Sequence, residues 1–376
     1  MCPTPAADAH GLFRNTRFFR SLDGLRCLSI LAVIWHHAGF RLENVVLFDS
    51  GRYGVHLFFA ISGFLITTLI LRERELTGNV SLRRFYMRRT LRIFPLYYVV
   101  MLLYIVLVAI IEGSSSQGRE FFHNLPYYLT YTGNWYVVYD GNVIFFFAWS
   151  LATEEQFYLF WPSIEKFLKR WTVPLMVALV TLRFIWEQGS IASVLPEDTL
   201  AHKIIRWSVM PPICFGVLLA HALHWERSFA VAWRMIGSRF ASAVIAVLIL
   251  LSVGLNLSQW ISFALMALLV GSCVIRDDHV LTWFLTLKPM AHMGKVSYGM
   301  YLLHVLASNA VVVVASPLGV RKHSTVAFIL TCIVAAVAAT ISYRYFESYF
   351  LRLKNRFAAV RKSRTEASPL TSTKAE

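Results

Sequence analysis

The chain has 376 residues, of which 57% are hydrophobic and only 15% are charged, with a formal net charge of +15. A soluble domain of this size needs more polar surface to cover its core, so the composition excludes that class and favours an integral membrane protein. The positive charge does not indicate nucleic-acid binding, because no basic domain stands apart from the apolar stretches. The five cysteines show no C-x-x-C pairing, so we expect neither a disulfide framework nor a metal site.

Apolar runs predict an all-α polytopic transmembrane helix bundle of about ten spans, since about 20 helical residues cross a bilayer core. The runs lie near residues 23–40, 53–71, 93–112, 142–162, 172–186, 205–225, 240–256, 259–275, 296–316 and 325–345. Strands are not expected, because the runs are long and lack a period-two alternation. We divide the chain into a cytoplasmic N-terminal segment at 1–22, a transmembrane domain at 23–350 and a basic, disordered cytoplasmic tail at 351–376.

The lysines and arginines predict the orientation of the bundle. With the N-terminus in the cytoplasm, the cytoplasmic segments hold 27 of the 36 basic residues and the external loops hold six. This strong bias and the even number of spans place both termini in the cytoplasm. The first run is interpreted as a retained helix, because a polar, arginine-bearing segment precedes it and many other runs follow. Three basic residues lie within the predicted helices, namely Arg26, Arg183 and Arg206.

The first run carries ionisable residues at membrane depth, in the stretch L-D-G-L-R-C-L-S-I-L-A-V-I-W-H-H. Arg26 and His37 are separated by three helical turns, so they share one face and lie about 17 Å apart along the axis. His36 points about 100° away from that face. Two interpretations are open. Either Arg26 extends to lipid phosphate while His37 bonds a neighbouring helix, or both belong to a functional site.

The second run contains G-V-H-L-F-F-A-I-S-G-F-L-I at residues 54–66. If it runs antiparallel to the first, His56 lies at a depth similar to that of His37. Ser62 and Gly63 are small enough to let another helix approach closely, which is their structural interpretation. His56 is interpreted either as an interfacial histidine without a chemical task or as part of a site.

An arginine cluster, S-L-R-R-F-Y-M-R-R-T-L-R, stands just before a proline. Arg84, Arg88 and Arg92 follow at i, i+4 and i+8 and form one stripe of a short cytoplasmic helix that Ser81 caps. Orientation and attraction to anionic lipid explain part of this charge. The seven basic residues between 72 and 92 exceed what orientation needs, and the guanidinium fork suits phosphate, so a phosphate site is favoured.

Two later runs also contain polar groups at depth. W-S-L-A-T-E-E-Q-F-Y-L-F-W-P, residues 149–162, places Glu154 and Glu155 in the membrane, where at least one carboxylate needs a partner such as histidine or arginine. Y-G-M-Y-L-L-H places His304 near mid-membrane in the ninth run. At the inner edge of the last run, Arg344 and Glu347 are expected to form a local i, i+3 ion pair.

With these five motifs in order, the chain resembles acyltransferase family 3, the bacterial integral membrane O-acyltransferases that modify envelope glycans, lipo-oligosaccharides and some macrolides. The likeness runs from L-D-G-L-R to F-E-S-Y-F, which is nearly the whole chain. It includes the arginine–ten residues–histidine motif, G-V-x-L-F-F-x-x-S-G-F-L-I, F-Y-x-R-R-x-x-R before I-F-P-L-Y-Y, W-S-L-x-x-E-E-Q-F-Y-L-F-W-P and Y-G-M-Y-L-L-H. Each motif alone is weak, but five in order are specific.

The resemblance implies transfer of a short acyl group, usually acetyl, from cytoplasmic acyl-coenzyme A to a carbohydrate hydroxyl in the bacterial plasma membrane. We expect the co-substrate to be bound by inner-face arginines, Arg26, Arg88, Arg89 and Arg92. His37 is the general base, and Glu154 or Glu155 orients an imidazole or binds the sugar. Substrate-binding roles fall to His56, Ser62, Tyr158 and His304. Direct transfer and an acyl-histidine relay are both open, and no metal is expected.

Two departures from the family pattern bear on this assignment. The second motif often has an acidic residue where this chain has His56, so a carboxylate partner there is not assumed. The chain also ends soon after the tenth run, without the extracytoplasmic hydrolase-like domain of some members, so a relay to such a domain needs a separate protein.

Two other functions compete with the acyltransferase interpretation. One is a transporter or flippase for a glycan or drug, with the buried charges along its path. The other is a sensor or scaffold without turnover. Broken helices and symmetry between halves, which favour a transporter, are not evident in the sequence. The expected partners are acyl-coenzyme A, a carbohydrate or glycosylated acceptor and membrane lipid, whereas the identity of the acceptor, the acyl chain length and the oligomeric state stay open.

Overall fold

The computed structural model of the chain describes residues 5–38, 50–137, 143–189, 196 and 199–357. Within these ranges the secondary structure is helical and contains no strand, as predicted. Each of the ten predicted apolar runs contains a helix. The greater part of the predicted tail, residues 358–376, lies outside the described ranges.

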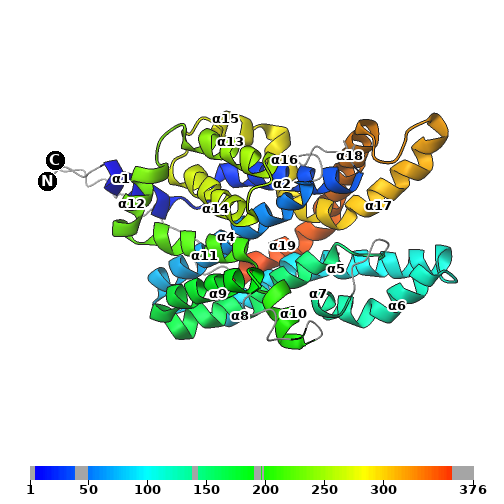
Figure 1. The fold of residues 1–376 in the computed structure, drawn as a ribbon, viewed down its shortest axis with the longest axis horizontal. Coiled ribbons are helices and arrows are strands. Elements are labelled where there is room, and N and C mark those ends of the chain that lie inside the picture. The colour runs from blue at the N-terminus through cyan, green and yellow to red at the C-terminus, as the bar shows by residue number, and fades with distance from the viewer. Residues whose placement is uncertain (1–4, 39–49, 138–142, 190–195, 197–198, 358–376) are drawn as a thin grey trace, which may run out of the picture.

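The helices follow one another along the chain with short connections (Figure 1). The first half comprises α1 (Pro5–Asn15), α2 (Arg20–Ala38), α4 (Tyr53–Thr77), α5 (Leu82–Ile111), α6 (Ser116–Leu129), α7 (Gly133–Tyr136), α8 (Ala148–Leu168) and α9 (Thr172–Glu187). The second half comprises α10 (Leu200–Trp207), α11 (Pro211–His224), α12 (Glu226–Ile236), α13 (Ala241–Gly254), α14 (Gln259–Ile275), α15 (Thr282–Leu285), α16 (Lys288–Lys295), α17 (Ser297–Ala315), α18 (Thr325–Ser342) and α19 (Ser348–Lys354).

Four helical segments are both long and apolar enough to cross a membrane: Tyr53–Thr77, Leu82–Ile111, Ser297–Leu318 and Thr325–Lys354. The number rises to six if two bent pairs each count as one span, α10 with α11 at 56° and α12 with α13 at 70°. An integral membrane protein is therefore supported, whereas the count of ten spans stays a prediction. Several predicted runs correspond to helices that are short, such as α11 and α14, or that carry charged residues.

The centre of the bundle is built from α2, α4, α11 and α14. The most extensive contact in the molecule joins α4 to α11, and α2 also packs on α4. Helices α17 and α18 form a second pair that lies against α2. In Figure 1 this pair and the pair formed by α5 and α6 extend as two arms to the same end of the molecule.

Glycines make the close approach of α4 and α11 possible. A Cβ atom at Gly63 would lie 2.2 Å from the carbonyl oxygen of Ile213, and one at Gly216 would lie 2.2 Å from that of Ala60. Real Cβ atoms do not tolerate such distances, so the helices must separate to admit a methyl group. The small-residue interpretation of Gly63 is therefore supported by the packing.

We expect Gly63→Ala to destabilise the folded protein by about 1–3 kcal/mol, because the added methyl group forces α4 away from α11. The midpoint of thermal unfolding in detergent measures this effect. Gly254→Ala is the matched control, since no atom lies within 4 Å of a Cβ at that position. Equal midpoints for the two variants would contradict the packing explanation.

Three local expectations differ from the structure. The short helix predicted before Pro95 continues through that residue to Ile111, because membrane helices tolerate proline. The segment at 113–141, which joins the third and fourth predicted runs, contains α6 and α7 and is not a loop alone. The Arg344–Glu347 ion pair does not form. These residues lie in a π-helical turn that changes the i, i+3 geometry, and Glu347 accepts a hydrogen bond from the Ser342 hydroxyl at 3.2 Å.

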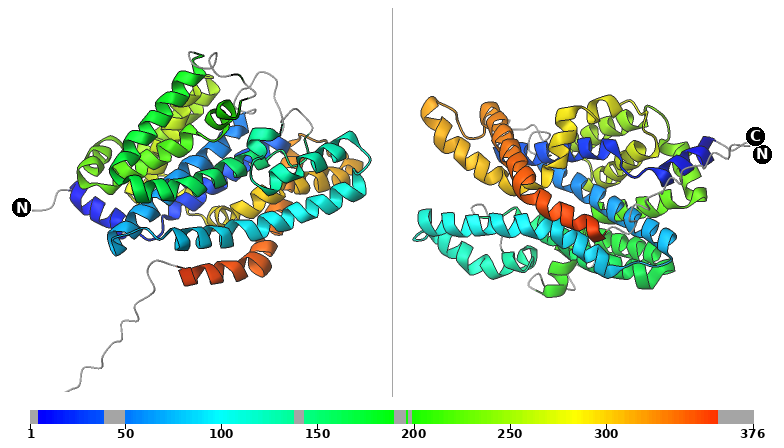
Figure 2. Two further views of the ribbon diagram at one scale, coloured as in Figure 1. Left: turned by 90° about the horizontal axis from the view of Figure 1, so that it is seen from below. Right: turned by 180° about the vertical axis from the view of Figure 1, so that it is seen from behind.

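The last described helix, α19, packs against the beginning of α5, the helix that bears the arginine cluster. Figure 2 shows α19 in red beneath the blue-to-cyan α5, outside the main body of the bundle. The Ser81 side chain caps α5 as predicted, accepting a hydrogen bond from the backbone N–H of Arg84. The arginine cluster is thus covered by the carboxyl end of the described chain.

Candidate active site

Two cavities lie along the middle of the bundle. The first, which we call the inner cavity, has a volume of about 180 Å³ and is lined by cationic, acidic and aromatic side chains, among them Arg26, Ser62, Arg89, Arg92, Glu154, Glu155, Tyr158, Tyr298 and Tyr301. The second, the outer vestibule, has a volume of about 710 Å³ and is lined by residues that include His36, His37, Arg52, His56, Trp149, Arg183, Glu187, Arg206, Trp207, Gln259 and Tyr301.

The two cavities share lining residues. Val55 and Tyr301 border both of them, and we call these two side chains the partition. The Tyr301 hydroxyl is held by Ser150 and by the carbonyl oxygen of Phe147. The arginines of the inner cavity and His37 of the vestibule thus lie on two sides of one small partition.

His37 is paired with His304 across the bundle. The Nε2 atom of His304 lies 3.0 Å from Nδ1 of His37, and its Nδ1 atom lies 2.6 Å from the carbonyl oxygen of Tyr301. Because a carbonyl only accepts, His304 donates its Nδ1–H there, and in its neutral form Nε2 accepts the Nδ1–H of His37. The hydrogen atom of His37 is thereby fixed on Nδ1. This leaves the basic lone pair on Nε2, as a general base requires.

A second polar group lies on the inner side, around Glu154. The Ser62 hydroxyl from α4 and the Tyr158 hydroxyl from α8 both donate to the same carboxylate oxygen of Glu154. The Arg89 guanidinium lies over the Tyr158 ring, with Cζ 3.5 Å from the ring centroid. Glu155 borders the same cavity and is attracted electrostatically by Arg89. Hydroxyl groups and a cation therefore stabilise these two partly buried carboxylates.

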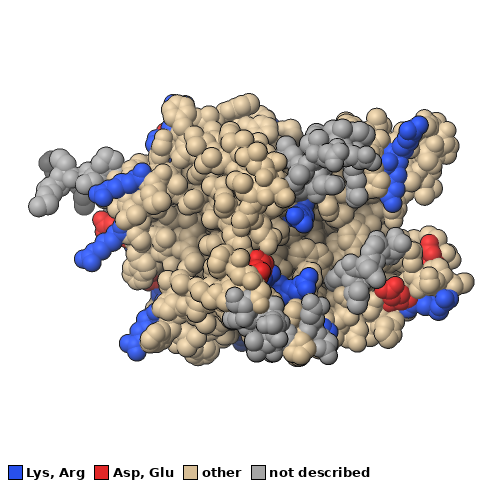
Figure 3. Space-filling view, viewed as in Figure 1, with Lys and Arg blue, Asp and Glu red and all other residues tan. Residues whose placement is uncertain are grey.

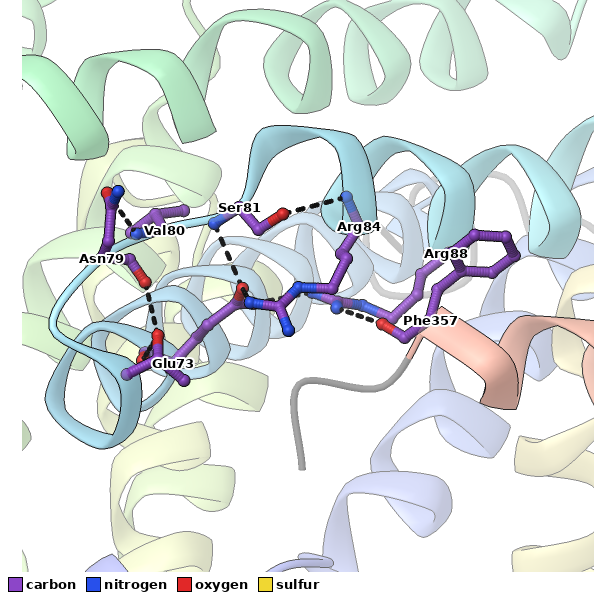
Figure 4. Close-up of polar contacts among 8 residues, drawn as sticks. Glu73, Asn79, Val80, Ser81, Arg84, Arg88 and Phe357 are labelled. Carbon is purple, nitrogen blue, oxygen red and sulfur yellow. Dashed lines mark hydrogen bonds and ion pairs between the residues drawn. The ribbon is translucent and has the colours of Figure 1, made fainter. Parts of the chain in front are cut away.

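The predicted arginine cluster at the start of α5 divides into two groups. Arg89 and Arg92 line the inner cavity together with Arg26, which also pairs with Asp23 at 2.8 Å. Arg88 does not line it. Figure 4 shows why: Arg88 reaches Glu73 at 3.0 Å and the carbonyl oxygen of Phe357 at 2.8 Å.

Glu73 explains this division of the arginines. It is a buried carboxylate at the end of α4 that pairs with Arg84 as well as with Arg88 and accepts the backbone N–H of Ser81 (Figure 4). Two of the three arginines of the predicted stripe, Arg84 and Arg88, therefore connect α5 to Glu73 of α4. The cavity receives the third, Arg92, together with Arg89.

The remaining predicted residues lie in three different places. His56 lines the vestibule with His37, on the opposite side of the partition from Ser62 and Tyr158. Its ring packs edge-on against Phe263, with centroids 4.7 Å apart. His304 borders neither cavity, is fully buried and contacts His37. Among the described residues, no group of three or more His, Cys, Asp or Glu side chains has the arrangement of a metal site.

Several residues of these cavities were not singled out from the sequence. Tyr301 belongs to the motif Y-G-M-Y-L-L-H, three residues before His304. Nothing in that motif indicates that this tyrosine lies between two cavities. Arg183, Arg206 and Glu187 belong to the vestibule. The positions of Arg183 and Arg206 within predicted membrane helices are the sequence feature that could have indicated a role in a cavity.

The glutamine of the E-E-Q motif has a different environment from its two neighbours. Gln156 donates to the carbonyl oxygen of Tyr131 at 2.8 Å and exchanges hydrogen bonds with Asn134. Its own carbonyl oxygen accepts from the Ser208 hydroxyl at 2.7 Å. Gln156 therefore connects α8 to the segments around α7 and α10 by hydrogen bonds, whereas Glu154 and Glu155 line the inner cavity.

Comparison with known proteins connects this arrangement to one group. A family profile described as an acyltransferase domain matches residues 19–344. The chain is 28% identical over 366 residues to the O-acetyltransferase OatA of Staphylococcus aureus strain NCTC 8325, and 26% identical over 377 residues to the peptidoglycan O-acetyltransferase OatA of Listeria monocytogenes serovar 1/2a. Each alignment covers 89% of this chain but 57% of the relative, so the chain spans little more than half of their length. No solved structure matches the chain.

Proposed function

Because the chain belongs to acyltransferase family 3, a family of acyltransferase enzymes, we propose that it transfers a short acyl group, acetyl, from cytoplasmic acyl-coenzyme A to a carbohydrate hydroxyl. The acceptor is an envelope polysaccharide, a lipid-linked oligosaccharide or a glycosylated metabolite. We place the protein in the bacterial plasma membrane as a multi-pass protein of ten spans with both termini in the cytoplasm. The positive-inside distribution of lysine and arginine supports this orientation.

One observation carries the proposal: the inner cavity and the outer vestibule meet at Val55 and Tyr301. The inner cavity presents Arg89 and Arg92, whose guanidinium groups suit the phosphates of coenzyme A. The vestibule presents His37. A donor held by the arginines directs its thioester past the partition, while the acceptor hydroxyl enters from the other side.

The hydrogen bonds of the histidine pair support the following chemical step. His37 accepts the proton of the acceptor hydroxyl on Nε2 as the oxygen attacks the thioester carbonyl carbon. The new C–O ester bond forms, the C–S bond breaks, and the departing thiolate of coenzyme A receives that proton. The positive charge of the His37 imidazolium stays on that ring and is stabilised by the Nδ1–H bond to His304, whose neutral ring is held by the carbonyl of Tyr301.

Purified protein in lipid nanodiscs, incubated with radiolabelled acetyl-coenzyme A and a glycan extract of the producing strain, tests the proposal. We expect release of the coenzyme A thiol and transfer of label to the glycan fraction. A transporter or a scaffold without turnover would give neither product. If folded protein left the thioester of acetyl-coenzyme A intact with every glycan and metabolite fraction, acyl transfer would be refuted.

His304 is proposed as a positioning residue that acts through His37. We expect His304→Ala to lower kcat about tenfold or more. Without its partner, the His37 ring spends less time with its proton on Nδ1 and with Nε2 directed at the acceptor hydroxyl. The KM for acetyl-coenzyme A should remain unchanged. His304→Gln should recover part of the loss, since its amide oxygen can accept the His37 Nδ1–H. Equal kcat values for the two variants would contradict the positioning role.

A further inference from the structure

The outer vestibule has an excess of positive charge that the proposed acyl-transfer chemistry does not use. Among the residues that the structure describes, Arg52, Arg183 and Arg206 line it, against a single acidic side chain, Glu187. Positive-inside topology does not account for this excess, because on the proposed orientation the vestibule faces the side that is poor in basic residues. In Figure 3 basic and acidic side chains border a hollow near the middle of one face.

The carboxylate of Glu187 is already fully engaged by other groups. It pairs with Arg183 at 2.6 Å, accepts the indole N–H of Trp260 at 2.6 Å and accepts the amide of Gln259 at 3.2 Å on each oxygen. This carboxylate therefore neutralises one arginine and positions it. It leaves no capacity to neutralise the other two.

Arg183 retains unused donors at the wall of the vestibule. Its side chain is 11% exposed, and its Nε and Nη1 atoms are buried without a hydrogen-bond partner among the described residues. Such donors are costly to leave unsatisfied, and a guanidinium edge matches the two oxygens of a carboxylate or phosphate group. The arrangement therefore has the features of an incomplete anion site.

Arg206 and Arg52 supply further positive charge. In the part of the chain that the structure describes, neither has an acidic side chain within ion-pair distance. The Arg206 guanidinium lies 5.3 Å from the ring centroid of Trp207, which in turn packs against Trp149 with centroids 5.8 Å apart. Large aromatic faces next to unpaired cations suit a ligand that combines apolar ring surface with negative charge.

We propose that the outer vestibule is the acceptor site and that it selects an anionic glycan, one that carries a carboxylate or phosphate group near the hydroxyl to be acylated. Arg183 and Arg206 bind the anionic group. Trp149 and Trp207 contact the sugar ring, and His37 of the same vestibule faces the hydroxyl. This inference rests on the proposed acyl transfer and adds the class of acceptor to it.

Binding of three fluorescent probes to the full chain in nanodiscs of neutral lipid tests the inference. The probes are trigalacturonate, the neutral trisaccharide obtained by reducing its carboxyl groups, and galactose linked to a short prenyl diphosphate. We expect at least one anionic probe to bind about fivefold more tightly than the neutral trisaccharide, the effect of one partly exposed ion pair. The probe that gains affinity identifies carboxylate or lipid diphosphate as the source of charge.

Arg206→Gln should remove this preference, and Arg206→Lys should retain part of it, because the charge remains while the planar fork is lost. Arg321→Gln, an exposed change in the loop between α17 and α18 and outside the vestibule, is the matched control. Equal affinity of wild-type protein for all three probes would overturn the inference. So would a preference that persists in Arg206→Gln.

Acetyl-coenzyme A binding, measured on the same samples, separates this inference from the proposed function. We expect the Arg206 variants to bind acetyl-coenzyme A as wild type does, which also verifies that they are folded. Absence of acetyl-coenzyme A binding by wild-type protein would count against acyl transfer. The preference of the protein for anionic probes would still test the chemistry of the vestibule.

Discussion

His37→Ala is expected to abolish acyl transfer, with kcat reduced by a factor of about 10²–10⁴, the usual contribution of a positioned general base. His304 fixes the proton of His37 on Nδ1, which leaves Nε2 to act as the base. Alanine removes the basic nitrogen without adding bulk to a partly buried position. Initial rates of thiol release from acetyl-coenzyme A, with acceptor present, measure the effect.

A matched substitution and a binding measurement accompany this variant. His123→Ala changes an exposed histidine of α6 that lines neither cavity, and we expect it to retain wild-type turnover. His37→Ala should still bind acetyl-coenzyme A, because the arginines of the inner cavity are untouched. Substantial residual transfer by folded His37→Ala would remove His37 from the role of base.

Local and periodic features of the fold could be predicted from the sequence. Apolar runs placed helices throughout the described chain, and the cap at Ser81 followed from one residue type before a helix. The number of membrane crossings could not be settled in the same way. Helices such as α11 and α14 are short, and two pairs of helices are sharply bent, so hydropathy does not decide which of them span a membrane.

The candidate site could be predicted only where its residues share a segment. Glu154 and Tyr158 belong to one motif, whereas the partner of His37 lies 267 positions away, at His304. The family resemblance assigned His304 to substrate binding, whereas the structure places its ring against His37. A contact between two distant helices depends on their packing, which the sequence of either helix does not contain.

The arginine cluster illustrates the same limit within a single helix. Helical spacing placed Arg84, Arg88 and Arg92 on one stripe. It could not show that Glu73 from α4 forms ion pairs with the first two. Arg89, which the stripe omits, reaches the inner cavity beside Tyr158. The distinction between an arginine that joins helices and one that faces a cavity therefore arises from tertiary contacts.

That distinction predicts a divided response to substitution. Arg89→Gln and Arg92→Gln should each raise the Kd for acetyl-coenzyme A about tenfold or more, because a charge-assisted hydrogen bond to phosphate contributes about 1.5–3 kcal/mol. Arg88→Gln should leave this Kd nearly unchanged and instead lower the midpoint of thermal unfolding, since it leaves the buried carboxylate of Glu73 with one fewer partner. Titration calorimetry and thermal unfolding measure the two quantities.

A second ligand and a further variant show whether phosphate recognition is the cause. Acetyl-pantetheine has the same thioester but lacks the nucleotide and its phosphates, so its affinity should not change in Arg89→Gln or Arg92→Gln. Arg83→Gln, on an exposed face of α5 away from the cavity, is the control for general loss of positive charge. If all four arginine variants weakened acetyl-coenzyme A equally, diffuse attraction by the basic surface would explain the result, and the inner cavity would lose its assignment as the donor site.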